Sequence, residues 1–371
     1  MDVIIVGAGF FGITVAERLA SAGYKVIVLE KRNHIGGNCY SEIDVDTGIE
    51  CHKYGSHIFH TSNERVWSYI NQFSKFNNYR HTVWTTLKDR VYSMPINLAT
   101  INAFYSMNLK PFQAKQFILD EIAKDRIKQP RNFQEKGISL IGRPLYSAFI
   151  RGYTLKQWEQ DPNELAPEII SRLPVRYNYN NRYFNDKYEG IPLEGYRKLF
   201  DRMIDQKNIE LRLNVDYFQV KNQTDARLTV FTGPIDRFFN YKYGCLDWRT
   251  LYFEIEHYDF PDYQGCPVMN YAEESVPYTR VHEFKHFHPE RKQLNKTIIY
   301  KEFSRISNNS DDPYYPVNTL RNRKILEMYQ TEAKKTPNVK FGGRLGEYRY
   351  LDMDATIAAA LELADRIMNG E

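Results

Sequence analysis

Near its start the chain reads Val3-Ile4-Ile5-Val6-Gly7-Ala8-Gly9-Phe10-Phe11-Gly12, an apolar run that ends in three spaced glycines. An amphipathic stretch and a second apolar run, residues 26–29, follow it and lead to Glu30. This order of strand, glycine-rich turn, helix and second strand with a terminal acidic residue is the dinucleotide-binding fingerprint. The first glycine permits the tight turn, the second lets the backbone approach a pyrophosphate, and the third allows the helix to pack on the strand. The sequence therefore predicts that an adenine dinucleotide binds here.

Glu30 and the loop after it bear on the identity of that cofactor. An acidic residue at this point accepts a hydrogen bond from a ribose hydroxyl and favours an unphosphorylated ribose, which leaves both NAD and FAD open. A glycine-bearing loop follows directly, Lys31-Arg32-Asn33-His34-Ile35-Gly36-Gly37-Asn38. Flavoproteins often carry such a loop along the cofactor, so it favours FAD. An ordinary surface turn is the alternative for this loop.

Length and composition exclude several classes of protein. A chain of 371 residues predicts two or three lobes. No run approaches the ~20 apolar residues of a spanning helix, and a strand begins the chain, so we expect neither a membrane protein nor a secretory signal. The net charge of +4 is too small and dispersed for nucleic-acid binding. The cysteines have no CxxC or zinc spacing, which is typical of reduced thiols in a cytosolic protein; they are Cys39, Cys51, Cys245 and Cys266.

The cofactor domain is predicted to be discontinuous. A second glycine-bearing segment, residues 341–345, stands near the C-terminus and is followed by a helix to about Met368. Residues 228–234 look like a strand that returns to the same domain. Between these pieces the pattern is helical from Asn97 to about Trp158, including a helix predicted from Leu140 to Gln157. Residues 177–192 and 246–305 are rich in Tyr, Phe, Thr and Val, and predict antiparallel strands.

Seven motifs in series closely resemble those of bacterial UDP-galactopyranose mutases, and they extend from residue 3 to about residue 360. Most of them are loose when taken singly, but their order is specific. They are the fingerprint with Glu30, His57-Ile58-Phe59-His60-Thr61, Gly152-Tyr153-Thr154-Leu155-Lys156-Gln157-Trp158, Arg172-Leu173-Pro174-Val175-Arg176, Val276-Pro277-Tyr278-Thr279-Arg280, Tyr314-Tyr315-Pro316, and Gly343-Arg344-Leu345 with Tyr350, Asp352 and Met353.

The resemblance implies an isomerase that interconverts UDP-galactopyranose and UDP-galactofuranose. In the family, N5 of reduced FAD attacks the anomeric carbon and expels UDP, and the ring of the covalent adduct opens and closes again through O4. The reaction has no net redox change, so an external reductant must reduce the flavin once. The resemblance also implies a cytoplasmic homodimer that supplies galactofuranose for cell-surface polysaccharide. UDP-N-acetylgalactosamine and other UDP-sugars stay open as further substrates.

The resemblance also implies the fold, which is an α/β chain of three lobes. We predict a Rossmann-like FAD-binding domain from residues 1–75, 195–240 and 325–371, and a helical lobe from residues 97–163. An antiparallel-sheet substrate lobe is predicted from residues 76–96, 164–194 and 241–324, with a mobile loop near residues 164–176.

Two arginines are the implied clamp for the UDP diphosphate. Guanidinium forks bond phosphate oxygens in pairs and stay charged, which suits Arg172 and Arg280 to this catalytic task. Arg172 lies in the proline-bracketed loop, which we expect to close over bound substrate. Arg176 is a candidate structural partner. Many relatives carry two phenylalanines where this chain has Phe149-Ile150, so the uracil pocket is expected to differ in shape. The other residues implied to hold the substrate are Phe149, Tyr153, Thr154, Trp158, Tyr183, Asn270, Tyr314 and Tyr350.

His60 is the third residue with an implied catalytic role, because its counterpart lies beside the isoalloxazine and can reach the sugar. The histidines at 52 and 57 are close in sequence, but no carboxylate or thiolate stands at a convincing ligand spacing, so no metal site is predicted. The helix that opens near Asp354 is expected to favour an anionic flavin through its dipole. The residues implied to bind FAD are Gly7, Gly9, Phe10, Phe11, Gly12, Glu30, Lys31, Gly37, Asn38, His57, Ile58, Gly233, Arg344, Tyr350, Asp352 and Met353.

Two other functions are compatible with an FAD fold. A flavin amine oxidase or desaturase would consume oxygen with its substrate and would not need two arginines. A non-catalytic nucleotide-binding protein would retain FAD without turnover when reduced. The arginine pair argues against the first alternative, and the motif at residues 152–158 argues against both. We expect no partner among nucleic acids or membranes.

Overall fold

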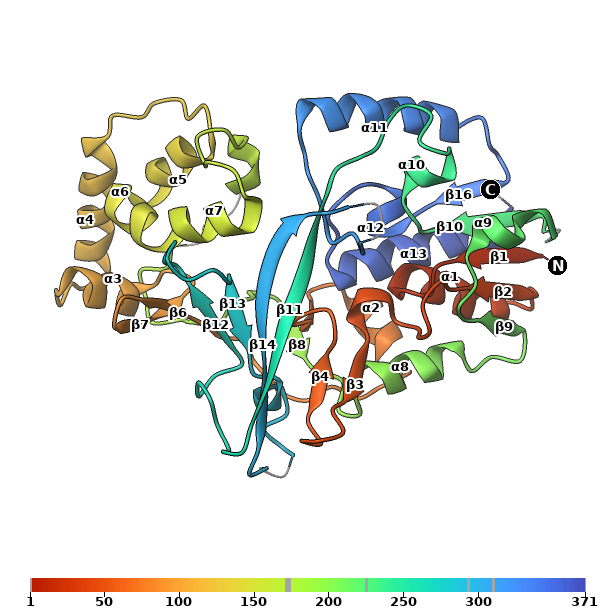
Figure 1. Cartoon of the computed structure of the whole chain (residues 1–371), viewed down its shortest axis with the longest axis horizontal. Helices are drawn as coiled ribbons and strands as arrows, with labels where there is room; N and C mark the ends of the chain where they lie inside the picture. The colour runs from red at the N-terminus through yellow and green to blue at the C-terminus, as the bar shows by residue number, and fades with distance from the viewer. Residues whose placement is uncertain (1, 171–174, 224–225, 292–293, 309–310, 371) are drawn as a thin grey trace.

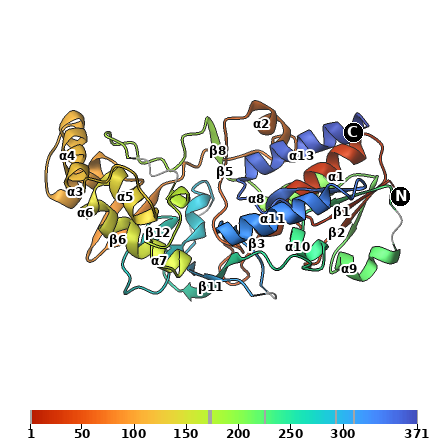
Figure 2. The ribbon, with the colours of Figure 1, turned by 90° about the horizontal axis from the view of Figure 1, so that it is seen from above.

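A computed structural model describes residues 2–170, 175–223, 226–291, 294–308 and 311–370. The chain forms a helical lobe at one end of its longest axis, a large β-sheet in the middle and an α/β lobe at the other end (Figures 1 and 2). Among the described residues, no helix has the length and apolar character that crossing a membrane requires.

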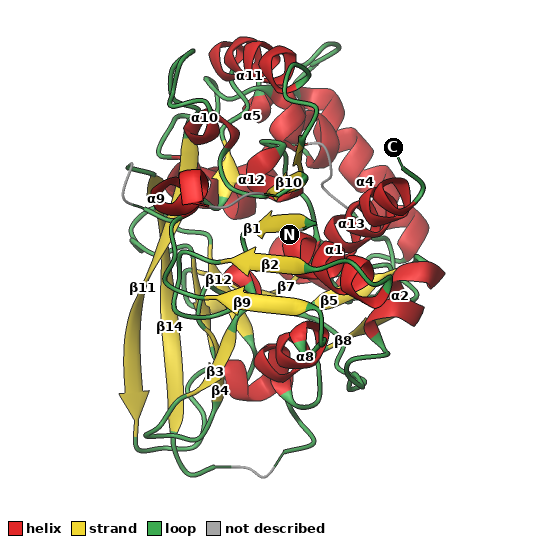
Figure 3. Ribbon diagram, turned by 90° about the vertical axis from the view of Figure 1, so that its right-hand side faces the viewer, coloured by secondary structure: helices red, strands yellow, loops and turns green. Residues whose placement is uncertain are grey.

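Five parallel strands build the α/β lobe in the order β16-β10-β1-β2-β9 (Figure 3). β1 and β2 are almost entirely buried, which explains why both are uninterrupted apolar runs. The strands are β1 Val3–Val6, β2 Val26–Leu29, β9 Ile209–Arg212, β10 Leu228–Phe231 and β16 Val339–Phe341. The helices of this lobe are α1 Phe10–Ser21, α2 Glu64–Ile70, α8 Gly195–Ile204, α9 Tyr217–Val220, α10 Ile235–Phe238, α11 Leu320–Ala333, α12 Gly343–Gly346 and α13 Met353–Met368.

The helical lobe packs around its own apolar core, which includes Ile101, Ile118, Phe133, Ile141 and Leu145. Its helices are α3 Leu98–Tyr105, α4 Pro111–Lys124, α5 Phe133–Ile141, α6 Arg143–Tyr146 and α7 Gly152–Trp158. The prediction of one helix over residues 140–157 is wrong at its start. Gly142 has a φ of +78° and ends α5, and a new helical stretch begins at Arg143 and continues through a π-helical turn at residues 147–151 into α7.

A seven-stranded sheet lies between the lobes, in the order β15-β11-β14-β13-β12-β6-β7. Every neighbouring pair is antiparallel except β12 and β6. The strands are β6 Val83–Leu87, β7 Arg90–Met94, β11 Trp248–Tyr258, β12 Val268–Tyr271, β13 Arg280–His282, β14 Thr297–Ile306 and β15 Tyr315–Pro316. The predicted α/β class, with an inserted helical lobe and a sheet lobe, is therefore confirmed.

Two short strand pairs link the α/β lobe to the rest of the chain. β3 (Ser41–Ile43) pairs with β4 (Glu50–His52), and β5 (Phe59–Thr61) pairs with β8 (Tyr188–Gly190). The remaining elements are the 3₁₀ turns at residues 37–39, 167–170, 221–223 and 284–287.

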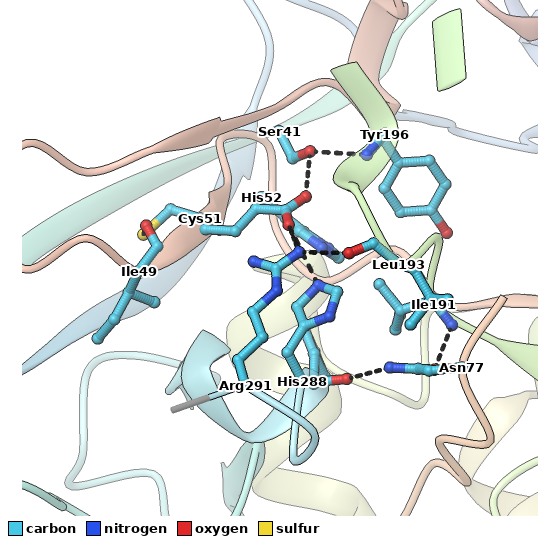
Figure 4. Close-up of polar contacts among 12 residues, drawn as sticks. Ser41, Ile49, Cys51, His52, Asn77, Ile191, Leu193, Tyr196, His288 and Arg291 are labelled. Atoms are coloured by element: carbon cyan, nitrogen blue, oxygen red, sulfur yellow. Dashed lines mark hydrogen bonds and ion pairs between the residues drawn. The ribbon is translucent and has the colours of Figure 1, made fainter. Parts of the chain in front are cut away.

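A buried carboxylate fastens the β3–β4 hairpin to the sheet lobe (Figure 4). Glu50 accepts hydrogen bonds from the Ser41 hydroxyl at 2.7 Å and from Arg291 at 2.7 Å, and lies 3.1 Å from Nε2 of His288. Burial alone would raise the pKa of Glu50, but His288, His52 and Ser41 lower it to about 2. Glu50 therefore stays ionised and joins segments that are 241 residues apart in the sequence.

The buried histidines predict that the fold is acid-labile. Burial lowers the pKa of His52 to about 3, of His57 to about 4 and of His81 to about 3. Because these pKa values lie below the ordinary 6.5, the stability that neutral histidines contribute is complete above pH 6.5 and is lost as the pH falls towards 3–4. We expect the free energy of urea unfolding to fall by roughly 2 kcal/mol per histidine between pH 7 and pH 5. The loss should be smaller in His81→Asn, and equal unfolding free energies at the two pH values would contradict this account.

Candidate functional site

A cavity of about 620 Å³ opens at the carboxyl ends of β1, β2 and β10. This edge of a parallel sheet is where open α/β folds bind ligands. Most of the predicted cofactor residues line it, namely Gly7, Gly9, Phe10, Phe11, Gly12, Glu30, Lys31, Gly37, Asn38, His57, Gly233, Arg344 and Met353.

Three of the predicted cofactor residues are not on this wall. The Ile58 side chain packs in the apolar core of the sheet lobe and is 6% exposed, so only the backbone of this residue could face a cofactor. The Tyr350 ring lies under the Arg344 guanidinium, 4.7 Å from its Cζ. Asp352 is the N-cap residue of α13, and its carbonyl accepts from the Thr356 amide.

Glycines bring two backbone segments together at the centre of the cavity wall. Gly7 has a φ of +100°, and a Cβ there would lie 2.1 Å from Oγ1 of Thr232. A Cβ on Gly9 would meet only the Gly37 Cα, at 3.9 Å. Gly9 is also the N-cap of α1 and adds no side-chain cap, so the first amides of that helix are left for a ligand. An anion such as a pyrophosphate fits this cradle.

Glu30 is positioned by the backbone beside this cradle. One carboxylate oxygen accepts from the Ala8 amide and the other from the Arg32 amide, both at 2.8 Å. Glu30 is 6% exposed and lines the cavity. The remaining lone pairs of its oxygens suit the hydroxyls of a ribose.

Arg32 forms a second charged part of the wall, which the sequence reading did not assign. Its guanidinium lies 4.4 Å above the Tyr54 ring, donates to Asn38 at 2.9 Å and pairs with Asp312 at 2.9 Å. Its Nε is buried and has no hydrogen-bond partner among the described residues. The wall therefore offers a buried donor, as a phosphate-bearing ligand would require.

Arg280, the first residue of β13, is held from two sides. Its Nε lies 3.2 Å from the Glu302 carboxylate, and a terminal nitrogen donates to the Tyr153 hydroxyl on α7. Glu302 is buried and also lies 2.9 Å from Nε2 of His282. Burial alone would raise the pKa of Glu302, but Arg280 and His282 lower it to about 2. The Arg280–Glu302 pair is therefore ionised, and the guanidinium is oriented for a further anion.

Aromatic rings join Arg280 to the cavity wall. The rings of Tyr315 and Tyr350 lie 5.9 Å apart, and the Arg344 guanidinium, which donates to the Leu351 carbonyl at 2.8 Å, lies over both. Burial raises the pKa of Tyr315, Glu302 raises it further, and Arg280 and Arg344 oppose the shift. Tyr315 therefore lies within electrostatic reach of both arginines.

Tyr314, which the sequence also predicts to bind substrate, lies at the edge of this group, with its ring 6.2 Å from that of Tyr315. Its buried ring lies 6.4 Å from that of Tyr54, and its pKa is raised by burial beside Arg32 and Asp312. Arg32 is the arginine that acts electrostatically on Tyr314, whereas Arg280 and Arg344 act on Tyr315.

A stack of rings surrounds His60. Its Nδ1 lies 2.8 Å from the Asp186 carboxylate, and its ring is stacked on Phe184 with centroids 3.7 Å apart. His81 continues the stack at 5.8 Å from Phe184 and also lies 5.4 Å from Tyr183. Burial lowers the pKa of His81, and Arg280 lowers it further. The structure thus brings His60 and Tyr183 to the Arg280 side of the molecule.

The remaining substrate candidates divide into two kinds. Phe149 is 5% exposed and packs between Tyr92 and Phe104 at 5.0 and 5.4 Å, so it belongs to the core of the helical lobe. Thr154 is buried in α7, and the Trp158 side chain packs against the same core. Asn270 differs from these, because it pairs with Arg280 across the sheet and its buried Oδ1 has no partner among the described residues.

Arg172 lies outside the described residues. Arg176 donates to the carbonyls of Asn180 and Arg182 and to the Asn185 amide oxygen, which indicates that it fastens the segment before β8. Residues 215–218 also line the cofactor cavity and were missed, because they carry no motif and reach the wall only through the position of α9.

Comparison with known sequences agrees with this geometry. A family model described as UDP-galactopyranose mutase matches residues 148–350, and one described as NAD(P)-binding Rossmann-like domain matches residues 5–73. The chain is 44% identical to a probable UDP-galactopyranose mutase of Klebsiella pneumoniae, over 99% of this chain and 95% of that protein. It is 42% identical to a dTDP-fucopyranose mutase of Escherichia coli, over 98% of this chain and 97% of that protein.

Comparison with solved structures supports the fold. A crystal structure of reduced UDP-galactopyranose mutase superposes with a TM-score of 0.76 and 17% identity, over 100% of this chain and 96% of that one. The three-lobed architecture therefore recurs at low sequence identity.

Proposed function

The chain belongs to the UDP-galactopyranose mutase family, and from this we propose that it is an isomerase that converts UDP-galactopyranose to UDP-galactofuranose and back with bound FAD. The observation that carries the proposal is the continuous path from the dinucleotide cradle to an ionised arginine. Arg344 lines the cofactor cavity, its guanidinium lies over Tyr315 and Tyr350, and Tyr315 lies within reach of Arg280.

The chain's own residues account for binding of the cofactor. The amides at the N-terminus of α1 and the Gly9–Gly37 approach suit the pyrophosphate, and Glu30 suits the adenosine ribose. Reduced FAD, if held by these residues, would supply the nucleophilic N5 for the anomeric carbon. Met353 and Thr356, in the first turn of α13, line the cavity, so the positive end of this helix would favour negative charge there.

Substrate binding is assigned to the Arg280 side. Arg280, with Arg172 from the loop, would bind the diphosphate, and its pairing with Glu302 fixes the direction of its fork. Asn270 offers a buried carbonyl oxygen without a partner among the described residues beside Arg280, where it would accept from a sugar or ribose hydroxyl. His60, oriented by Asp186, would lie next to the reacting ring.

A second substrate follows from the comparison with the dTDP-fucopyranose mutase, which is almost as similar as the first relative. Fucose is galactose without its 6-hydroxyl, so the same ring contraction would serve both sugars. The two nucleotides differ in a base methyl and a ribose hydroxyl. Our first choice is the UDP-sugar, and the dTDP-sugar is the alternative.

Turnover of each sugar nucleotide, measured separately, distinguishes the two candidate substrates. The reduced enzyme would be given UDP-galactopyranose and dTDP-fucopyranose in separate anaerobic assays, and furanose products would be measured by chromatography. We expect kcat/KM to be higher for the UDP-sugar. A higher kcat/KM for the dTDP-sugar would make that sugar nucleotide the substrate. If the protein consumed oxygen with an amine and turned over neither sugar, the oxidase alternative would be supported.

We further propose a cytoplasmic homodimer whose flavin is reduced by an external donor and whose product enters cell-surface polysaccharide. The four cysteines are unpaired, which is compatible with a reducing compartment. Size-exclusion chromatography with light scattering tests the dimer.

Arg344→Met is expected to weaken FAD binding. The change removes a cation from the cavity wall and donors to the carbonyls of Tyr314 and Leu351, so we expect the dissociation constant of FAD to rise about tenfold or more. Flavin fluorescence during titration of the apoprotein measures it. A wild-type dissociation constant for FAD in the variant would show that Arg344 does not contribute to cofactor binding.

A further inference from the structure

Lys156 is a residue of α7 whose side chain contacts the β12–β13 hairpin. Its ammonium donates to three backbone carbonyls, those of Tyr271 at 2.7 Å, Glu273 at 2.7 Å and Tyr278 at 3.0 Å. An ammonium has three N–H donors, so all of them are used. The acceptors come from both arms of the β12–β13 hairpin at its turn, and Lys156 therefore ties the two arms together.

Burial disfavours the charged form of the Lys156 side chain. Burial lowers the pKa of Lys156 to about 8, while Glu273 and Glu274 oppose the shift without forming an ion pair with it within the described residues. A lysine that was only a surface contact would keep its solvation. The three carbonyls replace water around this cation, so removing the ammonium would leave these carbonyls without their hydrogen-bond donor.

Other contacts at the same junction leave little freedom between α7 and the hairpin, which lie side by side in Figure 1. A Cβ on Gly152 would lie 2.3 Å from the Ala272 carbonyl oxygen, so the helix backbone touches the turn directly. Arg151 pairs with Glu274. The hairpin is thus fixed to the first turns of α7.

Tyr153 and Lys156 are three residues apart, which places them on one face of the helix. Tyr153 accepts from Arg280, which begins β13 directly after the turn that Lys156 holds. The position of Arg280 relative to Tyr153 therefore depends on how the hairpin is fastened to α7.

We propose that Lys156 is a positioning residue for the nucleotide diphosphate. It fixes the β12–β13 hairpin on α7 so that Arg280 and Tyr153 form one binding surface, and it does so without touching the substrate. The inference rests on the proposed function, since it takes the diphosphate of that substrate as the ligand of Arg280.

Calorimetric titration of the FAD-bound protein with UDP, and in parallel with dTDP, tests the inference. We expect Lys156→Met to raise the dissociation constant of the preferred nucleotide about tenfold, with FAD content unchanged, and Lys156→Gln, which keeps an N–H donor, to lie between it and wild type. If the methionine variant does not fold, the glutamine variant carries the test. Lys115→Met, an exposed lysine of the same lobe, serves as the control and should bind as wild type.

A double-mutant cycle shows whether Lys156 acts through Arg280. In an Arg280→Lys background, Lys156→Met should weaken binding by much less than tenfold, because the positioned group has already been changed. Multiplicative effects, or wild-type affinity of Lys156→Met, would overturn the inference. A wild-type protein that binds neither UDP nor dTDP would instead contradict the proposed function.

Discussion

Replacing Arg280 by methionine is expected to lower kcat/KM for the UDP-sugar by about 30-fold to about 4,000-fold, which corresponds to about 2–5 kcal/mol. Two losses add up in this variant. The diphosphate, which gains charge as UDP leaves the sugar, loses its guanidinium, and Glu302 is left as a buried carboxylate with His282 and Thr279 as its remaining partners.

Steady-state kinetics of the reduced enzyme measure this effect, and the dissociation constant of UDP shows how much of it lies in binding. Arg90→Met removes an exposed arginine from β7 and serves as the matched control, which should keep wild-type kinetics. FAD content should be unchanged in both variants, because Arg280 does not line the cofactor cavity. A kcat/KM within threefold of wild type for Arg280→Met would exclude it from the diphosphate site.

Gly9→Val is expected to abolish FAD retention while the apoprotein still folds. Gly9 has a φ of −81°, which any residue adopts, and its Cβ position meets only the Gly37 Cα at 3.9 Å. The added side chain would occupy the space that a pyrophosphate needs. We expect FAD affinity to fall by about 100-fold, or about 3 kcal/mol, whereas the apoprotein should lose only about 1 kcal/mol.

Gly12→Val is the informative contrast to this variant. A Cβ on Gly12 would lie 2.0 Å from the Gly7 carbonyl oxygen and 3.0 Å from an Ile5 methyl, so it destabilises the apoprotein itself. Urea unfolding of both apoproteins and their flavin absorbance after purification separate the two effects. Gly9→Val with a full complement of FAD would place the cofactor elsewhere.

The α/β lobe could be predicted because its determinants are local. The strand, turn and helix at residues 3–21 are set by apolar runs and by glycines: Gly7 has the positive φ that the turn needs, and Gly12 leaves no room for a Cβ. Arg280 was predicted as a site residue only through a resemblance that covers nearly the whole chain. Its pairing with Glu302 was not, because the two residues meet only when β13 and β14 pair.

The failures come from tertiary context. Apolar spacing alone does not reveal that Gly142 ends a helix, so the sequence predicts one element over residues 140–157. Residues 177–192 were predicted to form antiparallel strands, but only Tyr188–Gly190 form β8, and the segment before it is held by Arg176 contacts to backbone carbonyls. Whether Tyr314 or Tyr315 lies within electrostatic reach of Arg280 depends on the register of β15 against β11, which two adjacent tyrosines do not disclose.

The most direct test of the account is anaerobic turnover of UDP-galactofuranose by the FAD-bound protein, with and without dithionite, followed by chromatography of the UDP-sugars. The account predicts UDP-galactopyranose only after the flavin has been reduced, because the nucleophile belongs to the reduced cofactor. Equal conversion with oxidised flavin would contradict the proposed chemistry. No conversion of the UDP- or dTDP-sugar by protein with fully reduced flavin would contradict the proposed function.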